Sequence, residues 1–167
     1  MKLRVLQLGT EGYDIATELR GLLTHWSIDM GKRVSYLLQP KGTSPEDGAP
    51  VDKIQLEIER IHHTEDQFEE VDIPFEILGT RVTDKGSGFT GMAVAFIRHI
   101  NGCFHVVIQP PGALKKTGCP VRRRDFDLRQ CEGDKIPDLS PKKLAQSKEE
   151  RPSPDSTGEF HDMMSGE

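Results

Sequence analysis

The strongest constraint on the fold is an internal repeat, in which the same pattern occurs twice at an offset of 70 residues. The stretch SYLLQPKGTSPEDGAPV at 35–51 matches HVVIQPPGALKKTGCPV at 105–121. Without any gap, segments 8–58 and 78–128 are identical at eleven of 51 positions, whereas average residue usage gives roughly three by chance. The identical pairs are Leu8/Leu78, Gly9/Gly79, Thr10/Thr80, Asp14/Asp84, Gly21/Gly91, Gln39/Gln109, Pro40/Pro110, Gly42/Gly112, Gly48/Gly118, Pro50/Pro120 and Val51/Val121. Turn residues and apolar positions agree in one register, which predicts two copies of one unit of about 50 residues.

Short β-strands are predicted within each unit. In the second copy, MAVAFIRHI and CFHVVIQ are rich in β-branched and aromatic residues and flank Asn101-Gly102. This dipeptide is typical of a type I′ hairpin turn, in which both central residues have positive φ. The first copy places Met30-Gly31-Lys32 at the same point. Two more strands are expected near TRVTD and RDFDLRQ.

The predicted fold class is mainly β, with two tandem small SH3-like barrels or curled antiparallel sheets and an extended C-terminal arm. The expected boundaries are 1–60 for the first unit, 61–77 for a linker, 78–132 for the second unit and 133–167 for the arm. The arm has four prolines, many charges and few apolar residues, a composition typical of extended or disordered segments. Its last apolar cluster, Phe160, Met163 and Met164, is predicted to anchor a different subunit.

The second copy resembles a family of small phage and prophage proteins. The residues that carry the resemblance are Leu78, Gly79, Val82, Asp84, Gly88, Phe89, Gly91, Gly102, Cys103, Gln109, Pro110, Phe126, Asp127 and Leu128. They form the series Leu-Gly-x-x-Val-x-Asp, Gly-Phe-x-Gly, Asn-Gly-Cys, Gln-Pro and Phe-Asp-Leu. The first copy departs from it, because it lacks Gly-Phe-x-Gly and has Lys32-Arg33 where Gly-Cys would fall. The resemblance implies phage origin more than a mechanism, and no catalytic activity is known for the family.

One basic segment contrasts with a chain whose formal net charge is −5. Its residues are Lys115, Lys116, Arg122, Arg123 and Arg124. They are candidates for binding a nucleic acid, a phosphorylated ligand or an acidic partner surface. The alternative is a solvated loop that neighbouring acidic residues balance.

No metal and no cofactor are expected. His99, Cys103, His105, Cys119 and Cys131 concentrate in the second copy, and a zinc site among them is the less favoured interpretation because their spacing does not fit a zinc motif. Cys119 has basic neighbours but no visible base to activate it as a nucleophile. Three cysteines without an obvious pairing favour a reducing compartment.

The function expected is that of a non-enzymatic phage structural or assembly protein. It would sit in the virion or the host cytoplasm, form homo- or hetero-oligomers and contact other phage proteins through its β units and its arm. The N-terminal residues lack the apolar stretch of a signal peptide, and no apolar run approaches a membrane span. The alternative function is a phage accessory protein that binds a nucleotide-like ligand or a host defence factor through the basic segment. An enzyme is the third choice, since no catalytic motif occurs.

Overall fold

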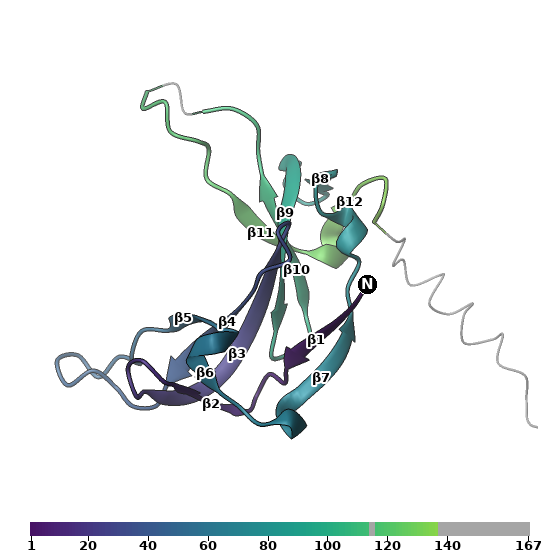
Figure 1. Ribbon diagram of the computed structural model, residues 1–167. Coiled ribbons are helices and arrows are strands. Elements are labelled where there is room, and N and C mark those ends of the chain that lie inside the picture. Colours follow the sequence, from purple (N-terminus) through teal and green to yellow (C-terminus); the bar gives the residue numbers. More distant parts are fainter. Residues whose placement is uncertain (114–115, 137–167) are drawn as a thin grey trace, which may run out of the picture. The chain divides into compact units, whose positions relative to one another are not determined.

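The computed structural model describes residues 1–113 and 116–136, and these form one compact unit of mainly antiparallel β-structure (Figure 1). The first half contains strands β1 (Lys2–Leu6), β2 (Glu11–Asp14), β3 (Arg20–Asp29), β4 (Val34–Pro40), β5 (Ile54–Glu57) and β6 (Ile61–His62), with a 3-10 turn η1 (Ile58–Arg60). Between the halves lie η2 (Glu65–Gln67), β7 (Phe68–Asp72) and η3 (Phe75–Ile77). The second half contains β8 (Arg81–Asp84), β9 (Thr90–His99), β10 (Phe104–Gln109), β11 (Arg124–Asp127), η4 (Leu128–Gln130) and β12 (Cys131–Glu132).

The elements of the second half begin 70 residues after those of the first. Strands β2 to β6 correspond in this way to β8 to β12, and the end points agree to within one residue. Residues with positive φ follow the same spacing: Gly9/Gly79, Glu18/Gly88, Lys32/Gly102, Gly42/Gly112 and Gly48/Gly118. Both long strands also carry a bulge at the same place, next to Leu23 in β3 and next to Ala93 in β9. The two hairpins therefore have matching backbone geometry.

The halves are joined edge to edge by their long strands. Strand β3 pairs antiparallel with β9, and Ser27 stands opposite Ile97 at the centre of this pairing. Those two residues are themselves 70 positions apart, so the hairpins are related by a local two-fold axis at this point. Strands β1 and β7 form a separate two-stranded sheet, in which Lys2 stands opposite Asp72 at the same offset.

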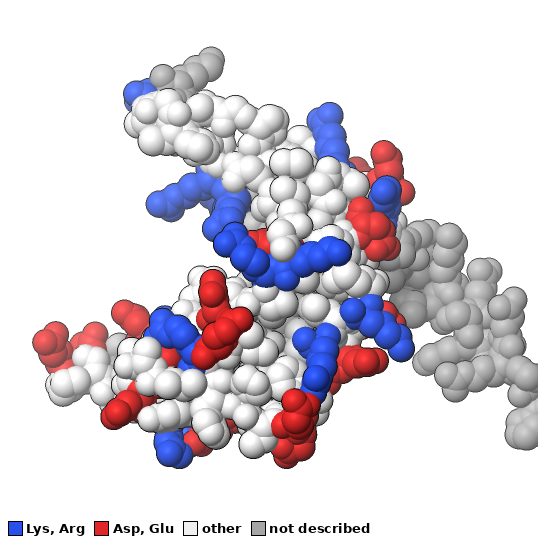
Figure 2. Space-filling model, viewed as in Figure 1, with Lys and Arg blue, Asp and Glu red and all other residues white. Residues whose placement is uncertain are grey.

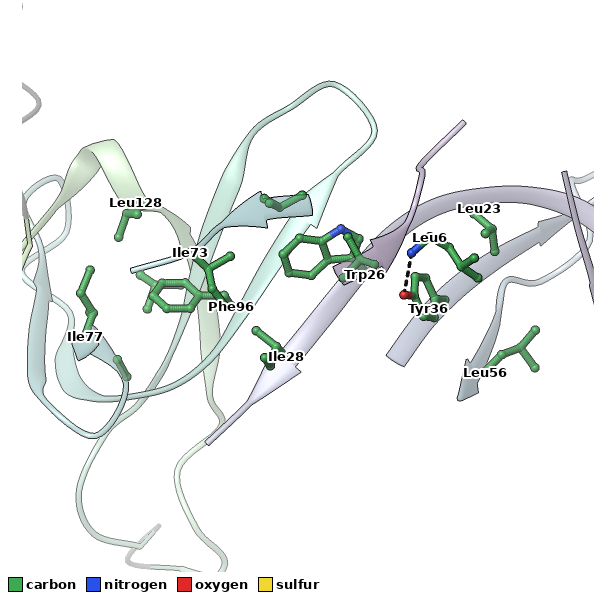
Figure 3. Close-up of a cluster of buried hydrophobic side chains, with 14 of the residues drawn as sticks. Leu6, Leu23, Trp26, Ile28, Tyr36, Leu56, Ile73, Ile77, Phe96 and Leu128 are labelled. Atoms are coloured by element: carbon green, nitrogen blue, oxygen red, sulfur yellow. Dashed lines mark hydrogen bonds between the residues drawn. The ribbon is translucent and has the colours of Figure 1, made fainter. Parts of the chain in front are cut away.

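The two halves share one hydrophobic core. Trp26 and Ile28 of β3, Phe96 of β9, and Ile73 and Ile77 from the segment between the halves are all fully buried in a single cluster (Figure 3). The backbone N–H of Leu6 donates a hydrogen bond of 2.9 Å to the hydroxyl of the buried Tyr36, which ties β1 to β4 (Figure 3). Each half thus completes the core of the other.

The mainly β prediction is confirmed, with open sheets rather than barrels. Neither sheet closes on itself in residues 1–113 and 116–136. The segment predicted as a linker, 61–77, carries β7, which pairs with β1 along its whole length. Ile136 also packs against the core, so the compact unit ends four residues beyond the predicted boundary.

The Asn101-Gly102 hairpin is tight, but its turn type differs from the prediction. Gly102 has φ of 84°, whereas Asn101 does not have positive φ. The N–H of Gly102 donates to the carbonyl of His99, and the N–H of His99 donates to the carbonyl of Cys103. This is a type I turn followed by a left-handed glycine, the second commonest hairpin solution, and it needs only one residue at positive φ.

Candidate binding groove

The sheet that runs β5–β4–β3–β9–β10–β11 has one face in the core and one open face. Because side chains alternate along a strand, Trp26 and Ile28 of β3 enter the core while His25, Ser27 and Asp29 face outward. The open face holds a groove of about 590 Å3. The groove is lined by His25, Ser27, Asp29, Arg33, Val34, Ser35, Tyr36, Leu37, Gln55, Glu57, Ala95, Ile97, Val107, Arg123, Arg124 and Asp125.

The first-half wall of the groove is a network of paired polar groups. The hydroxyls of Ser27 and Ser35 lie 2.8 Å apart, and the Gln55 amide donates to Ser35 at 3.0 Å. The Arg33 guanidinium donates to the Asp29 carboxylate at 3.1 Å. These bonds fix the orientation of the side chains, so the wall is preformed.

A row of histidine rings from β3, β9 and β10 lies beside the groove, and His25 of this row is part of the groove lining. The ring centroids of His25 and His99 are 5.1 Å apart, and those of His99 and His105 are 4.5 Å apart. The Nδ1 atom of His105 lies 2.9 Å from the Asp125 carboxylate. The Nε2 atom of His99 is buried and has no hydrogen-bond partner among the residues that the structure describes. The row therefore contains one polar atom whose bonding capacity is unused.

The environment lowers the pKa of two histidines in this row, His25 and His99. Burial lowers the pKa of His25 to about 4, and the neighbouring His99 adds to the effect. Burial, and then repulsion from His105, also lower the pKa of His99. The hydrogen bond from His105 lowers the pKa of Asp125, so that carboxylate stays ionised. His25 and His99 therefore offer neutral imidazole rings on the same face as an ionised carboxylate.

The predicted basic segment divides into two groups. Arg123 and Arg124 line the groove, whereas Lys116 and Arg122 are exposed and do not contribute to its lining. Lys115 lies outside the described residues. In Figure 2 basic side chains gather across the middle of the molecule, with acidic side chains just below them. Within the described residues, the basic segment therefore offers Arg123 and Arg124 to a ligand bound in the groove.

The other predicted positions are not brought together. The anchor residues Phe160, Met163 and Met164 lie outside the described residues. Cys131 is buried, Cys119 is exposed and Cys103 is half-buried, and all three are free thiols. Burial raises the pKa of Cys131 to about 11, which makes it a poor nucleophile.

Sequence reasoning missed Asp125 and His25. His99 and His105 were noted, but their acidic partner comes from β11, and only the register of β10 with β11 places it there. His25 joins the row because β3 pairs with β9, where it stands opposite His99. The offset of 70 was the available signal, since it makes β3 and β9 equivalent edges that can pair.

No family model, curated protein or solved structure matches this chain. Among the residues that the structure describes, no helix is long and apolar enough to cross a membrane.

Proposed function

We propose that this protein is a non-enzymatic bacteriophage assembly protein that binds a partner protein along the groove and its two free strand edges. The phage assignment rests on the resemblance of the second half to phage and prophage proteins. The binding role rests on the open, preformed face of the sheet. The partner is another phage protein or a second copy of this chain, in a virion or in the host cytoplasm.

The observation that carries the proposal is the position of the sheet edges. Among the described strands, β5 pairs only with β4, and β11 pairs only with β10. Both edges flank the groove, since Gln55 and Glu57 of β5 and Arg124 and Asp125 of β11 line it. An exposed edge accepts a further strand through main-chain hydrogen bonds, while the adjacent pockets select side chains.

The proposal includes two copies of one SH3-like β unit in tandem. It is supported by the recurrence of strands, bulges and positive-φ residues at one offset. A unit of about 50 residues is near the lower limit for a core of its own. Duplication enlarges the core, and the groove forms across the junction of the two copies.

Particle incorporation tests this function. Mass spectrometry of purified particles should detect the protein, and the double variant Gln55→Lys/Glu57→Lys should reduce its incorporation because charged lysines on an edge block strand addition. Glu59→Lys is the control, since it reverses the charge of an exposed glutamate outside the groove, as Glu57→Lys does within it. Absence of the wild-type protein from particles would sink the proposal.

A second variant tests the arm. Deleting 137–167 should leave the compact unit folded, by circular dichroism and thermal melting, and abolish incorporation. The cut falls after Ile136 because that residue packs against the core. Normal incorporation of the truncated protein would remove the arm from the proposal.

The alternative function, binding of a nucleotide-like ligand, is favoured by Arg123 and Arg124 on the groove wall. Arginine presents a planar fork that matches phosphate oxygens. A thermal-shift screen of cyclic and linear nucleotides tests it. Arg123→Glu should abolish any stabilisation, whereas Arg122→Glu, at an exposed residue outside the groove lining, should not. No shift with any nucleotide would reject this alternative.

A further inference from the structure

We propose that a side-chain cluster beside the groove is a site for a divalent transition-metal ion of the zinc class, with His99, His105 and Asp125 as its ligands. This inference is independent of the partner or ligand assigned to the groove. It also differs from the sequence-based expectation of no metal, because the residues that converge are not the cysteines.

The three side chains come together from three adjacent strands. His99 ends β9, His105 lies in β10 and Asp125 lies in β11. In the pairings His105 stands opposite Ile97 and Asp127, so His99 and Asp125 are each its diagonal neighbours on the same face. One potential ligand atom from each residue lies within 4.8 Å of the others.

These donors match the chemistry of the zinc class. Two imidazoles and one carboxylate are a common protein ligand set for zinc, with a further position left to water or another group. A metal binds an imidazole through a ring nitrogen that carries no proton. A bound ion would also use the buried Nε2 of His99, which has no other partner.

Only a small movement is needed to close the site. In a tetrahedral zinc site with metal–nitrogen bonds of about 2.0–2.1 Å, the ligand atoms lie about 3.3–3.4 Å apart. Side-chain rotations that reduce the present spread of up to 4.8 Å to that value would close the site. The 2.9 Å approach of His105 to Asp125 already brings two of the three donors together.

The site opens toward the groove. Asp125 is part of the groove lining, and so is His25, whose ring stands beside His99. The remaining coordination position would face that space and accept water or a group of a bound partner. His25 borders this position and is not one of the three ligands.

Metal titration of the full-length, tag-free protein tests the site. After treatment with a chelator, the protein should bind one equivalent of Zn²⁺ in competition with a chromophoric chelator, and its melting temperature should rise. Co²⁺ should give the visible absorption of a tetrahedral or five-coordinate site. His99→Gln and Asp125→Asn should each weaken binding by at least about tenfold.

Two controls make the result specific. His62→Gln removes an exposed histidine from β6, outside the cluster, and should leave binding unchanged. Cys103→Ser should also leave it unchanged. Failure of the wild-type protein to compete with the chelator would overturn the proposal, and so would equal affinity in wild type and His99→Gln. Binding that is lost in Cys103→Ser but kept in His99→Gln would assign the metal to the thiols instead.

Discussion

Equivalent positions in the two halves hold equivalent carboxylates with different partners. Asp14 and Asp84 are both buried. Arg60 donates two hydrogen bonds to Asp14, at 3.1 and 2.6 Å. Gln130 occupies the position equivalent to Arg60, and Asp84 Oδ1 has no hydrogen-bond partner within the described part of the chain. The second half thus lacks the arginine–carboxylate hydrogen bonds that the first half has at the equivalent position.

Gln130→Arg should therefore stabilise the protein. The backbone carbonyl of Arg60 accepts a hydrogen bond from Ile15, and that of Gln130 accepts the equivalent bond from Lys85. The side chain of an arginine at 130 would therefore leave the backbone at the same position relative to Asp84. We expect the melting temperature to rise by roughly 2–4 °C, the effect of one added charged hydrogen bond in a chain of this size. Arg60→Gln should lower it. A fall in Gln130→Arg would show that the two sites differ in more than this residue.

Both carboxylates should make the fold sensitive to acid. Hydrogen bonds from the Ser87 side chain and backbone lower the pKa of Asp84. For Asp14, burial alone raises the pKa, but hydrogen bonds from Thr17 and Arg60 outweigh it and the net pKa is lowered. As the pH approaches and passes the unfolded aspartate pKa of 3.8, the unfolded chain binds more protons than the folded one, so stability is lost as pH falls. Melting temperature should drop between about pH 5 and pH 3, and less steeply in Asp84→Asn. Parallel profiles for the two proteins would contradict this.

At the scale of elements, the hairpin turns depend on one residue at positive φ. Gly102 occupies this position in the second half and Lys32, with φ of 61°, occupies it in the first. Gly102→Val should destabilise the protein by about 1–3 kcal/mol, because a β-branched residue is strained there. Gly102→Lys should cost less, since Lys32 adopts the same conformation. Chemical denaturation measures both, and an unchanged midpoint in Gly102→Val would argue against the turn.

A second glycine is required where the two strands of a hairpin cross closely. A Cβ atom on Gly91 would lie 2.3 Å from the carbonyl oxygen of Gln109, and on Gly21 it would lie 2.1 Å from that of Gln39. Backbone atoms cannot move aside cheaply, so Gly91→Ala should destabilise the protein by about 3 kcal/mol. Gly86→Ala is the matched control, because its new Cβ would meet nothing closer than 3.5 Å. Equal denaturation midpoints for the two variants would refute the prediction.

Much of the strand and turn structure could be predicted from the sequence. Strands β8 to β11 and the hairpin around Gly102 were predictable, because β-rich runs and turn residues are local signals. The turn type was not, since a type I turn with a left-handed glycine also suits Asn101-Gly102. Strand β7 was missed because FEEVD has no clear alternation, and its pairing with β1 is a contact between distant segments. Asp125 was missed as well, because it reaches the histidines only through the pairing of β10 with β11.

At the scale of the whole molecule, the halves should unfold together. The two halves share one hydrophobic cluster, and the tip of each hairpin contacts the other half. The Sδ atom of Met30 lies near Gly79, and Ile100 lies against Gly9. Phe96→Leu should lower stability by about 1–2 kcal/mol and reduce amide protection in β4 as well as in β10. Hydrogen exchange with mass spectrometry measures this. Two separate melting transitions, or loss of protection in β10 alone, would show independent halves.

Side-chain differences between the two halves give the groove a direction that their two-fold related backbones alone would not. If the two halves were identical in sequence, the two-fold axis would make both walls of the groove the same. A bound segment would then have the same binding energy in either orientation. Here the backbone repeats but the side chains do not: the first wall contributes Glu57, and the second contributes Arg123 and Arg124. An extended segment with one acidic and one basic end therefore has a preferred polarity, with its acidic end beside the arginines.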